Sequence, residues 1–258
     1  MLASIKKNLK KSLGEKTFWT EGHGSLVLAI LVALTIRWLF LEAFVIPSGS
    51  MLPTLLKHDH IFVNKMAYGV RVPFSKKWMF QFDGPKPGEV AVFRNPEDEV
   101  FYIKRVVGMP GDKIYYEKGN LYINDLLVEK SVPSENKSDW DWLRADDFEF
   151  QGPDSLSMYV HWEEKLGKHN YSVLLSKYEF EEEFGPVTVP DGHYFVMGDN
   201  RRNSKDSRRM KPEFRYIPYE NLVGKAMFVW LSCEKTLGRV PICNPLTIRF
   251  NRFFHSIH

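Results

Sequence analysis

The sequence predicts a mainly β protein, built on an antiparallel sheet or open barrel and preceded by one N-terminal transmembrane helix. Beyond residue 42, short runs rich in β-branched and aromatic residues alternate with turn signals, and before it there is one long apolar window. The runs are 60–65, 89–93, 101–107, 113–116 and 121–123. The glycine-containing turns between them include 86–88, 109–112 and 118–120. Such short connections favour an antiparallel meander over alternating helices and strands.

The transmembrane helix is expected at residues 25–41. Its most apolar window, Leu26–Leu41, is slightly shorter than the roughly 20 residues that span a bilayer. Arg37 lies near its end, where a long side chain can reach the interface. Five lysines and two acidic residues occur in residues 1–24, so this basic N-terminus is expected in the cytoplasm and everything from Glu42 onward outside.

Two alternatives to a membrane anchor are a cleavable secretory signal and a buried core helix. No small-x-small cleavage site follows the apolar segment, and its basic region is long for a secretory signal. No polar stripe divides residues 26–36, as it would in a helix that covers a core. An anchor is therefore the preferred interpretation.

Length and charge limit the class of protein. The 258 residues, 44% hydrophobic and 26% charged, suffice for one sizeable core or two small ones plus an anchor. The formal net charge of +3 is modest and the lysines are dispersed, so nucleic acid is an unsuitable partner.

The domain order follows from changes in composition. Residues 131–147 are polar and contain tryptophan, and residues 178–183 are acidic and aromatic. This shift predicts an inserted, β-rich subdomain at 129–186. The β character resumes at 193–197 and 222–230, so the main β domain is expected in 42–128 and 187–258.

Cys233 and Cys243 are the two cysteines of the chain, ten positions apart with Gly238 and Pro241 between them. This spacing suits a disulfide that closes a hairpin in an exported domain, and two unpaired thiols are the alternative. Two cysteines without clustered histidines make a poor zinc site, so no metal is expected.

Ser50 and Lys104 are candidate reacting groups. Ser50 follows Gly49 in a turn that can expose a hydroxyl. A serine needs a neighbouring base, and a lysine can be that base when burial lowers its pKa. Lys104 has apolar neighbours and, in a strand, shares a face with Tyr102 and Val106. Taken singly, Ser50 is better explained as an ordinary turn serine and Lys104 as a solvent-facing strand lysine, because a Ser–Lys pair has no local spacing rule.

Four blocks resemble type I signal peptidases, in the order of that family. They are Ser48–Thr54 after the apolar segment, His60–Lys65, Tyr102–Asp112 and Gly198–Arg208. Together they cover roughly residues 36 to 229, and the joint match is specific. The resemblance implies a serine endopeptidase of the plasma (inner) membrane, without metal or organic cofactor. It would remove signal peptides from exported precursor proteins after small-x-small motifs, with membrane lipid as a second partner.

The resemblance also implies roles for individual residues. Ser50 is the acylating nucleophile and Lys104 the general base. Ser48 donates its hydroxyl to the oxyanion, and Ser204 hydrogen-bonds and orients the lysine amine. Supporting ion pairs are formed by Arg105, Asp199, Asp206 and Arg208. Shallow pockets for small side chains of the substrate are lined by Phe44, Ile46, Tyr102 and Ile103.

The last block departs from the family pattern by its basic character. Arg202 stands where the family commonly has an acidic residue, and residues 209–211 replace a more usual aromatic and glycine ending. Ser204 and Asp206 remain in place. The departure is therefore expected to affect local salt bridges or substrate preference more than activity.

Two other functions compete with this interpretation. Self-processing Ser–Lys peptidases related to the self-cleaving repressors share the chemistry, but they are soluble and lack the 198–200 block. A non-catalytic, membrane-anchored β scaffold has no physical need for the four polar residues Ser48, Ser50, Lys104 and Ser204 together.

Overall fold

The computed structural model describes residues 23–72, 75, 77–133, 139–148, 155–177, 182–238 and 240–257. The chain divides into two compact units, Met1–Glu42 and Ala43–His258. The lysines of the expected cytoplasmic N-terminus lie outside the described residues.

The described part of the first unit is mainly helix α3, His23–Leu39. Its residues 26–34 are all apolar and exposed. Among the described residues, no helix combines the length and the apolar character that crossing a membrane requires.

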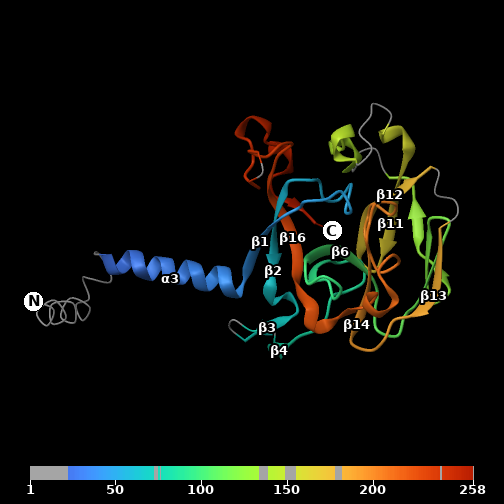
Figure 1. Ribbon diagram of the computed structural model, residues 1–258, viewed down its shortest axis with the longest axis horizontal. Coiled ribbons are helices and arrows are strands. Elements are labelled where there is room, and N and C mark those ends of the chain that lie inside the picture. The colour runs from blue at the N-terminus through green and yellow to red at the C-terminus, as the bar shows by residue number, and fades with distance from the viewer. Residues whose placement is uncertain are drawn as a thin grey trace, which may run out of the picture. The chain divides into compact units, whose positions relative to one another are not determined.

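The second unit is built on an eight-stranded sheet in the order β1-β2-β16-β5-β6-β14-β15, with β17 also paired to β16. Figure 1 labels β1, β2, β16, β6 and β14 of this sheet. Its strands are β1 (Leu41–Val45), β2 (Asp59–Asn64), β5 (Val90–Arg94), β6 (Phe101–Gly108), β14 (His193–Met197), β15 (Ile217–Pro218), β16 (Leu222–Ser232) and β17 (His255–Ser256). From β2 onward, neighbouring strands pair antiparallel. The predicted mainly β, antiparallel class is confirmed.

The long strand β16 pairs with β2 along one side and β5 along the other. Its register shifts twice against β2 and once against β5. Such bulges bend a strand and increase its twist, which lets one sheet curl around a core.

Three smaller sheets complete the unit. They are β3 (Gly69–Arg71) with β4 (Trp78–Gln81); β13 (Glu183–Thr188), β7 (Lys113–Glu117), β8 (Asn120–Ile123) and β9 (Leu126–Leu127); and β10 (Glu129–Ser131), β11 (Tyr159–Leu166) and β12 (His169–Ser176). The segment 129–186 thus contributes one three-stranded sheet and adds β13 to the edge of the β7–β8 hairpin.

The turn after Ser50 is fixed by packing on two sides. Met51 and Leu55 are fully buried in the core cluster of β2, β5 and β16. Leu52 and Leu56 are fully buried in a second cluster, which residues 139–177 supply. Residues four positions apart share one side of a helical turn, and the Leu55 N–H donates to the Met51 carbonyl at 2.9 Å. Burial on both sides therefore sets the direction in which the chain leaves Ser50.

Candidate active site

The structure brings Ser50 and Lys104 together. Lys104 lies on β6 opposite Ala91 of β5, and its Nζ is 2.7 Å from Ser50 Oγ. The Nζ also donates to the Ile103 carbonyl at 2.9 Å. Ser50 is 8% exposed and Lys104 is 4% exposed. The two side chains, 54 positions apart, thus form a direct hydrogen bond inside the fold.

Burial lowers the pKa of the Lys104 amine to about 8, because the charged form loses its hydration. Asp206 and Asp199 act in the opposite direction and limit the drop in the pKa. An amine with this pKa is largely neutral at mildly alkaline pH and can accept the proton of a bound hydroxyl.

Ser48 lies beside the candidate nucleophile. Its Oγ is 3.4 Å from Ser50 Oγ, and its side chain is exposed. A hydroxyl in this position is available to a substrate that reaches Ser50, together with the backbone N–H of Ser50 itself. Two such donors are what an oxyanion site needs.

Ser204 is placed differently from the expectation. Its hydroxyl is buried and makes no hydrogen bond to Lys104. It lies close enough to Asp206 to help to lower the pKa of that carboxyl. The expected hydrogen bond to the lysine amine is therefore absent from this geometry.

Asp206 and Arg208 form a buried ion pair in the same loop as Ser204. Arg208 Nε donates to Asp206 Oδ1 at 3.0 Å and its Nη2 to Oδ2 at 2.9 Å. The Gly198 N–H also donates to Asp206 Oδ2, at 2.9 Å. Burial alone would raise the pKa of Asp206, but the charge and hydrogen bonds of Arg208 lower it overall. The carboxylate therefore stays ionised and holds the start of the 198–208 loop.

Arg105 and Asp199 form a second buried pair, on the other face of β6 from Lys104. Arg105 Nε donates to Asp199 Oδ1 at 2.8 Å and Nη2 to Oδ2 at 2.7 Å. Thr54 donates its hydroxyl to the same carboxylate at 2.5 Å. This bidentate pair joins β6 to the 198–208 loop and to the turn that follows Ser50.

Three of the four expected substrate-binding residues lie together. Ile46 is buried in the cluster of β2, β5 and β16, and Phe44 and Ile103 pack partly exposed against it. Tyr102 lies on the opposite face of β6, where its ring centroid is 5.4 Å from the Lys104 Nζ. Phe44, Ile46 and Ile103 thus form an apolar surface, and Tyr102 covers the lysine.

Asn200 is a positioning residue that the sequence alone did not identify. Its Nδ2 donates to the Gly49 carbonyl at 3.0 Å, and its N–H donates to the Ser50 carbonyl at 3.1 Å. Both bonds are made to the backbone of the turn that carries Ser50. The side chain is 1% exposed, so water cannot replace it easily.

Replacing Asn200 with aspartate is expected to weaken both the fold and catalysis. The substitution keeps the size but faces a carboxylate oxygen toward the Gly49 carbonyl, so a buried hydrogen bond becomes a repulsion. Unfolding free energy should fall by about 1–3 kcal/mol, and kcat should fall more than KM rises. Urea unfolding and steady-state kinetics measure both effects. Unchanged kcat in Asn200→Asp would contradict the positioning role.

A buried ion pair between Glu164 and Arg201 was also missed. Arg201 Nη1 donates to Glu164 Oε1 at 2.7 Å and Nη2 to Oε2 at 2.5 Å, and each side chain is 1% exposed. The Tyr171 hydroxyl donates to Glu164 Oε2 at 2.9 Å. The pair ties β11 to the residue after Asn200. No local sequence signal marks it, because the partners are 37 positions apart.

The loop after Ser50 is also bound by Arg252, which lies near the end of the sequence. Arg252 Nη2 donates to the Thr54 carbonyl at 3.1 Å and to Asp59 Oδ2 at 2.6 Å. Asp59 Oδ2 also accepts from the Leu56 N–H at 2.9 Å. Arg252 and Asp59 are fully buried. Backbone groups of this loop are thus bound by a charged pair that the loop itself does not contain.

Cys233 and Cys243 form a disulfide, with their Cα atoms 5.6 Å apart. The ligand atoms of both cysteines and of His60 lie within 4.8 Å of one another. A sulfur in a disulfide is not a thiolate and does not bind a metal ion as one. The pair therefore closes the hairpin after β16.

Comparisons with known proteins agree on one family. A family model described as signal peptidase, peptidase S26, matches residues 19–231. Signal peptidase I of Pseudomonas aeruginosa is 38% identical over 233 residues, which cover 86% of this chain and 76% of that protein. Signal peptidase I of Rickettsia massiliae is 33% identical over 268 residues, 96% of each chain.

A solved structure of a signal peptidase I from Enterococcus faecalis V583 also matches. It is 21% identical and covers 56% of this chain and 98% of its own, with a TM-score of 0.32 that is too low to support an argument about the fold. The family model spans most of the sequence and includes both Ser50 and Lys104. The chain therefore belongs to the signal peptidase family, peptidase S26.

Proposed function

We propose that this chain removes N-terminal signal peptides from exported precursor proteins by acyl transfer, with Ser50 as nucleophile and Lys104 as general base. One observation carries the proposal. The amine and the hydroxyl lie 2.7 Å apart, both buried, in a setting that lowers the pKa of the lysine to about 8. A nucleophile in hydrogen-bond contact with a base is the arrangement that covalent catalysis by serine requires.

The proposed reaction has two stages. Lys104 takes the Ser50 proton as Oγ attacks the scissile carbonyl, and the resulting ammonium gives that proton to the leaving amine. Water, deprotonated by the same amine, then hydrolyses the ester on Ser50. In both stages the Ser50 N–H and the Ser48 hydroxyl donate to the oxyanion, which typically supplies about 3–4 kcal/mol per donor.

Ser204, Asp206 and Arg208 are proposed as supports of the dyad. The Asp206–Arg208 pair fixes the loop that begins at Gly198, and Ser204 lies within this loop. A rotation of the Ser204 hydroxyl toward Lys104 would orient the amine for proton transfer. The burial of Ser204 supports such a role, because water cannot easily take the place of its hydroxyl. Arg105 and Asp199 are proposed to be structural.

Substrate recognition is proposed to depend on Phe44, Ile46, Tyr102 and Ile103. β1 is the first strand of the eight-stranded sheet and carries Phe44; among the described residues no strand pairs with its outer edge, which could accept an extended peptide by strand addition. The apolar surface beyond it would accept only small side chains. Precursors would thus be cut after small-x-small motifs.

The location of the protein is also a proposal. Residues 25–41 would form a single-pass anchor in the inner membrane, with residues 1–24 cytoplasmic and the catalytic domain, 42–128 and 187–258, outside. Residues 129–186 would be an insertion in that domain. The Cys233–Cys243 disulfide supports an extracytoplasmic position, because disulfides persist mainly in oxidising compartments.

Cleavage of a purified precursor tests the function. The full chain in detergent is incubated with a secretory precursor that has alanine at the position before the scissile bond, and the new N-terminus is identified by mass spectrometry. A precursor with tryptophan at that position is the matched control. We expect cleavage of the alanine precursor only. An intact alanine precursor, or equal cleavage of both, would refute the proposal.

The pH dependence follows from the lowered pKa of Lys104. The base works only when neutral, so kcat/KM should fall about tenfold for each pH unit below 8 and level off above it. Initial rates between pH 5 and 10, with thermal unfolding followed in parallel, measure this profile. A profile that is flat between pH 6 and 8 would contradict a lysine base.

The same shift affects stability with a definite sign. The folded pKa of about 8 lies below the ordinary value of 10.5, so between these values the unfolded chain binds more protons. The contribution of Lys104 to the unfolding free energy therefore rises with pH across this window.

A further inference from the structure

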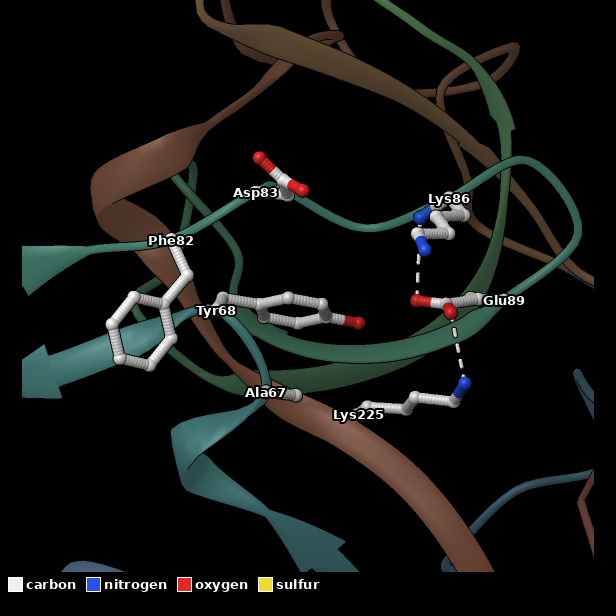
Figure 2. A pocket seen from close by; sticks show the side chains of 8 residues that line it. Ala67, Tyr68, Phe82, Asp83, Lys86, Glu89 and Lys225 are labelled. Atoms are coloured by element: carbon white, nitrogen blue, oxygen red, sulfur yellow. Dashed lines mark hydrogen bonds and ion pairs between the residues drawn. The ribbon is translucent and has the colours of Figure 1, made fainter.

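Two cavities of the described structure differ in their charge. The first, of about 320 Å³, is lined by Asp83 and Glu89 and by two lysines, Lys86 and Lys225. Lys225 Nζ is 2.8 Å from Glu89 Oε1, and the Lys86 N–H donates to Glu89 Oε2 at 3.2 Å. Figure 2 shows the Tyr68 hydroxyl pointing toward this group. Its charges are balanced within the cavity itself.

The second cavity, of about 230 Å³, has no such balance among the lining residues that the structure describes. It lies between the β7–β8 turn and strands β10, β11 and β12. Its lining residues are Tyr116, Lys118, Gly119, Lys130, Val160, Trp162, Leu175, Ser176 and Lys177. Three of these are lysines and none carries a carboxylate. We call this space the lysine cavity.

Lys130 is the most enclosed cation of the lysine cavity. Its Nζ donates to the Gly119 carbonyl at 3.1 Å and to Asn120 Oδ1 at 2.8 Å, and it lies 5.1 Å from the Trp162 ring centroid. Burial lowers its pKa, Glu164 partly offsets this, and the charge of Arg201 lowers the pKa further. These partners hold the ammonium in place without neutralising it.

Two acidic side chains near the lysine cavity are paired with arginines that do not line it, and a third pairs with one of its lysines. Glu164 is bound to Arg201 inside the fold, and Glu182 is bound to Arg208 at 3.0 Å. Glu117 contacts Lys118 at 3.2 Å on the surface, where such a pair contributes little. Within the described residues, neither Lys130 nor the third lysine of the cavity forms an ion pair with a carboxylate.

Arg202 adds a fourth cation at the wall of the cavity. Its Nη1 donates to Ser176 Oγ at 2.9 Å. This is the position at which the sequence departs from the usual acidic residue. An acid here would add negative charge beside Ser176, whereas the arginine adds positive charge.

We propose that the lysine cavity binds a phosphoryl anion. Three ammonium groups and a guanidinium around one small space suit a group that carries up to two negative charges on several oxygens. Trp162, Val160 and Leu175 give the same cavity an apolar wall, which fits the uncharged part of a phosphate ester. The size admits a headgroup or a free phosphate ester, and either source supplies the same chemistry.

Binding to a catalytically inactive variant tests this site independently of the proposed peptidase function. The full Ser50→Ala chain in neutral detergent is titrated calorimetrically with inorganic phosphate, glycerol 3-phosphate, dihexanoyl phosphatidylglycerol and hexaglutamate. We expect saturable binding of at least one phosphate probe, weakened by added salt. Binding of the first two identifies a free phosphate, and binding of the lipid alone identifies a headgroup.

Exposed lysines provide the variants, because their removal leaves the core intact. Lys118→Gln combined with Lys177→Gln should raise Kd about tenfold or more, since two charge-assisted contacts with the anion are lost. Lys165→Gln is the matched control: it lies on β11, pairs at 3.7 Å with Glu129 and does not line the cavity. It should bind like the parent.

Three results would overturn the assignment. They are the absence of saturable binding of every phosphate probe at about 10 mM, equal affinity of the double variant and the parent, and tighter binding of hexaglutamate than of all phosphate probes.

Discussion

Replacing Lys104 with methionine is expected to lower kcat for precursor cleavage by about 10²–10⁴-fold, the usual contribution of a general base. Methionine has similar length and no proton-accepting group, so it fills the space beside Ser50 Oγ without doing the chemistry. The same change should raise the midpoint of thermal unfolding. Burial disfavours the charged lysine, as its lowered pKa shows, and methionine has no charge to bury.

The combination of lost activity and gained stability separates this outcome from misfolding. Ser50→Ala should lose as much activity as Lys104→Met, and the double variant should lose no more than either, since the two groups act as a unit. Cleavage assays and thermal unfolding on the three variants measure this. Comparable cleavage by either single variant, or additive losses in the double variant, would show that the two residues do not act as a dyad.

Replacing Gly198 with alanine is expected to lower kcat by about a hundredfold, although no reacting group is removed. A Cβ at this position would lie 2.3 Å from Ser204 Oγ and 2.5 Å from the Ser50 carbonyl oxygen. The serine can rotate away, but the carbonyl is backbone and must shift. Because it belongs to the candidate nucleophile, the shift changes the distance between Oγ and the Lys104 amine. KM should change less than kcat.

Gly192→Ala is the matched control for this experiment. Nothing lies within 4 Å of the Cβ that it would add, but its φ of +70° disfavours a side chain. It should therefore lower the unfolding midpoint and leave kcat near the parent value. If Gly198→Ala retains the parent kcat, or if both variants lose kcat equally, crowding at Ser50 is not the cause.

The elements of the main sheet were predictable because their sequence signals are local. The runs expected at 60–65, 89–93, 101–107 and 193–197 lie within one residue of β2, β5, β6 and β14 at each end. Each run combines β-branched or aromatic residues with a glycine or asparagine turn nearby. The bulges of β16 were not predictable, because they depend on two partner strands at once.

The residues of the candidate site likewise divide into those with a local sequence signal and those that depend on tertiary contacts. Ser50 and Lys104 could be identified because each lies in a recognisable block, and the structure places them in contact. Asn200 lies in such a block as well, yet its hydrogen bond to Gly49 depends on a tertiary approach that spacing does not reveal. No sequence signal marked Glu164, because only its buried ion pair with Arg201 distinguishes it from the other acidic residues.

The contacts of Arg252 with Thr54 and Asp59 bear on the order of events during synthesis. Arg252 follows Asp59 by 193 positions. The turn that carries Ser50 is synthesised early. Arg252 can form its hydrogen bonds with Thr54 and Asp59 only after nearly all of the catalytic domain has left the ribosome. We expect chains that end before residue 252 to fold parts of the sheet yet cleave no precursor. A truncation series assayed for both properties would show whether the peptidase stays inactive until late in its own biosynthesis.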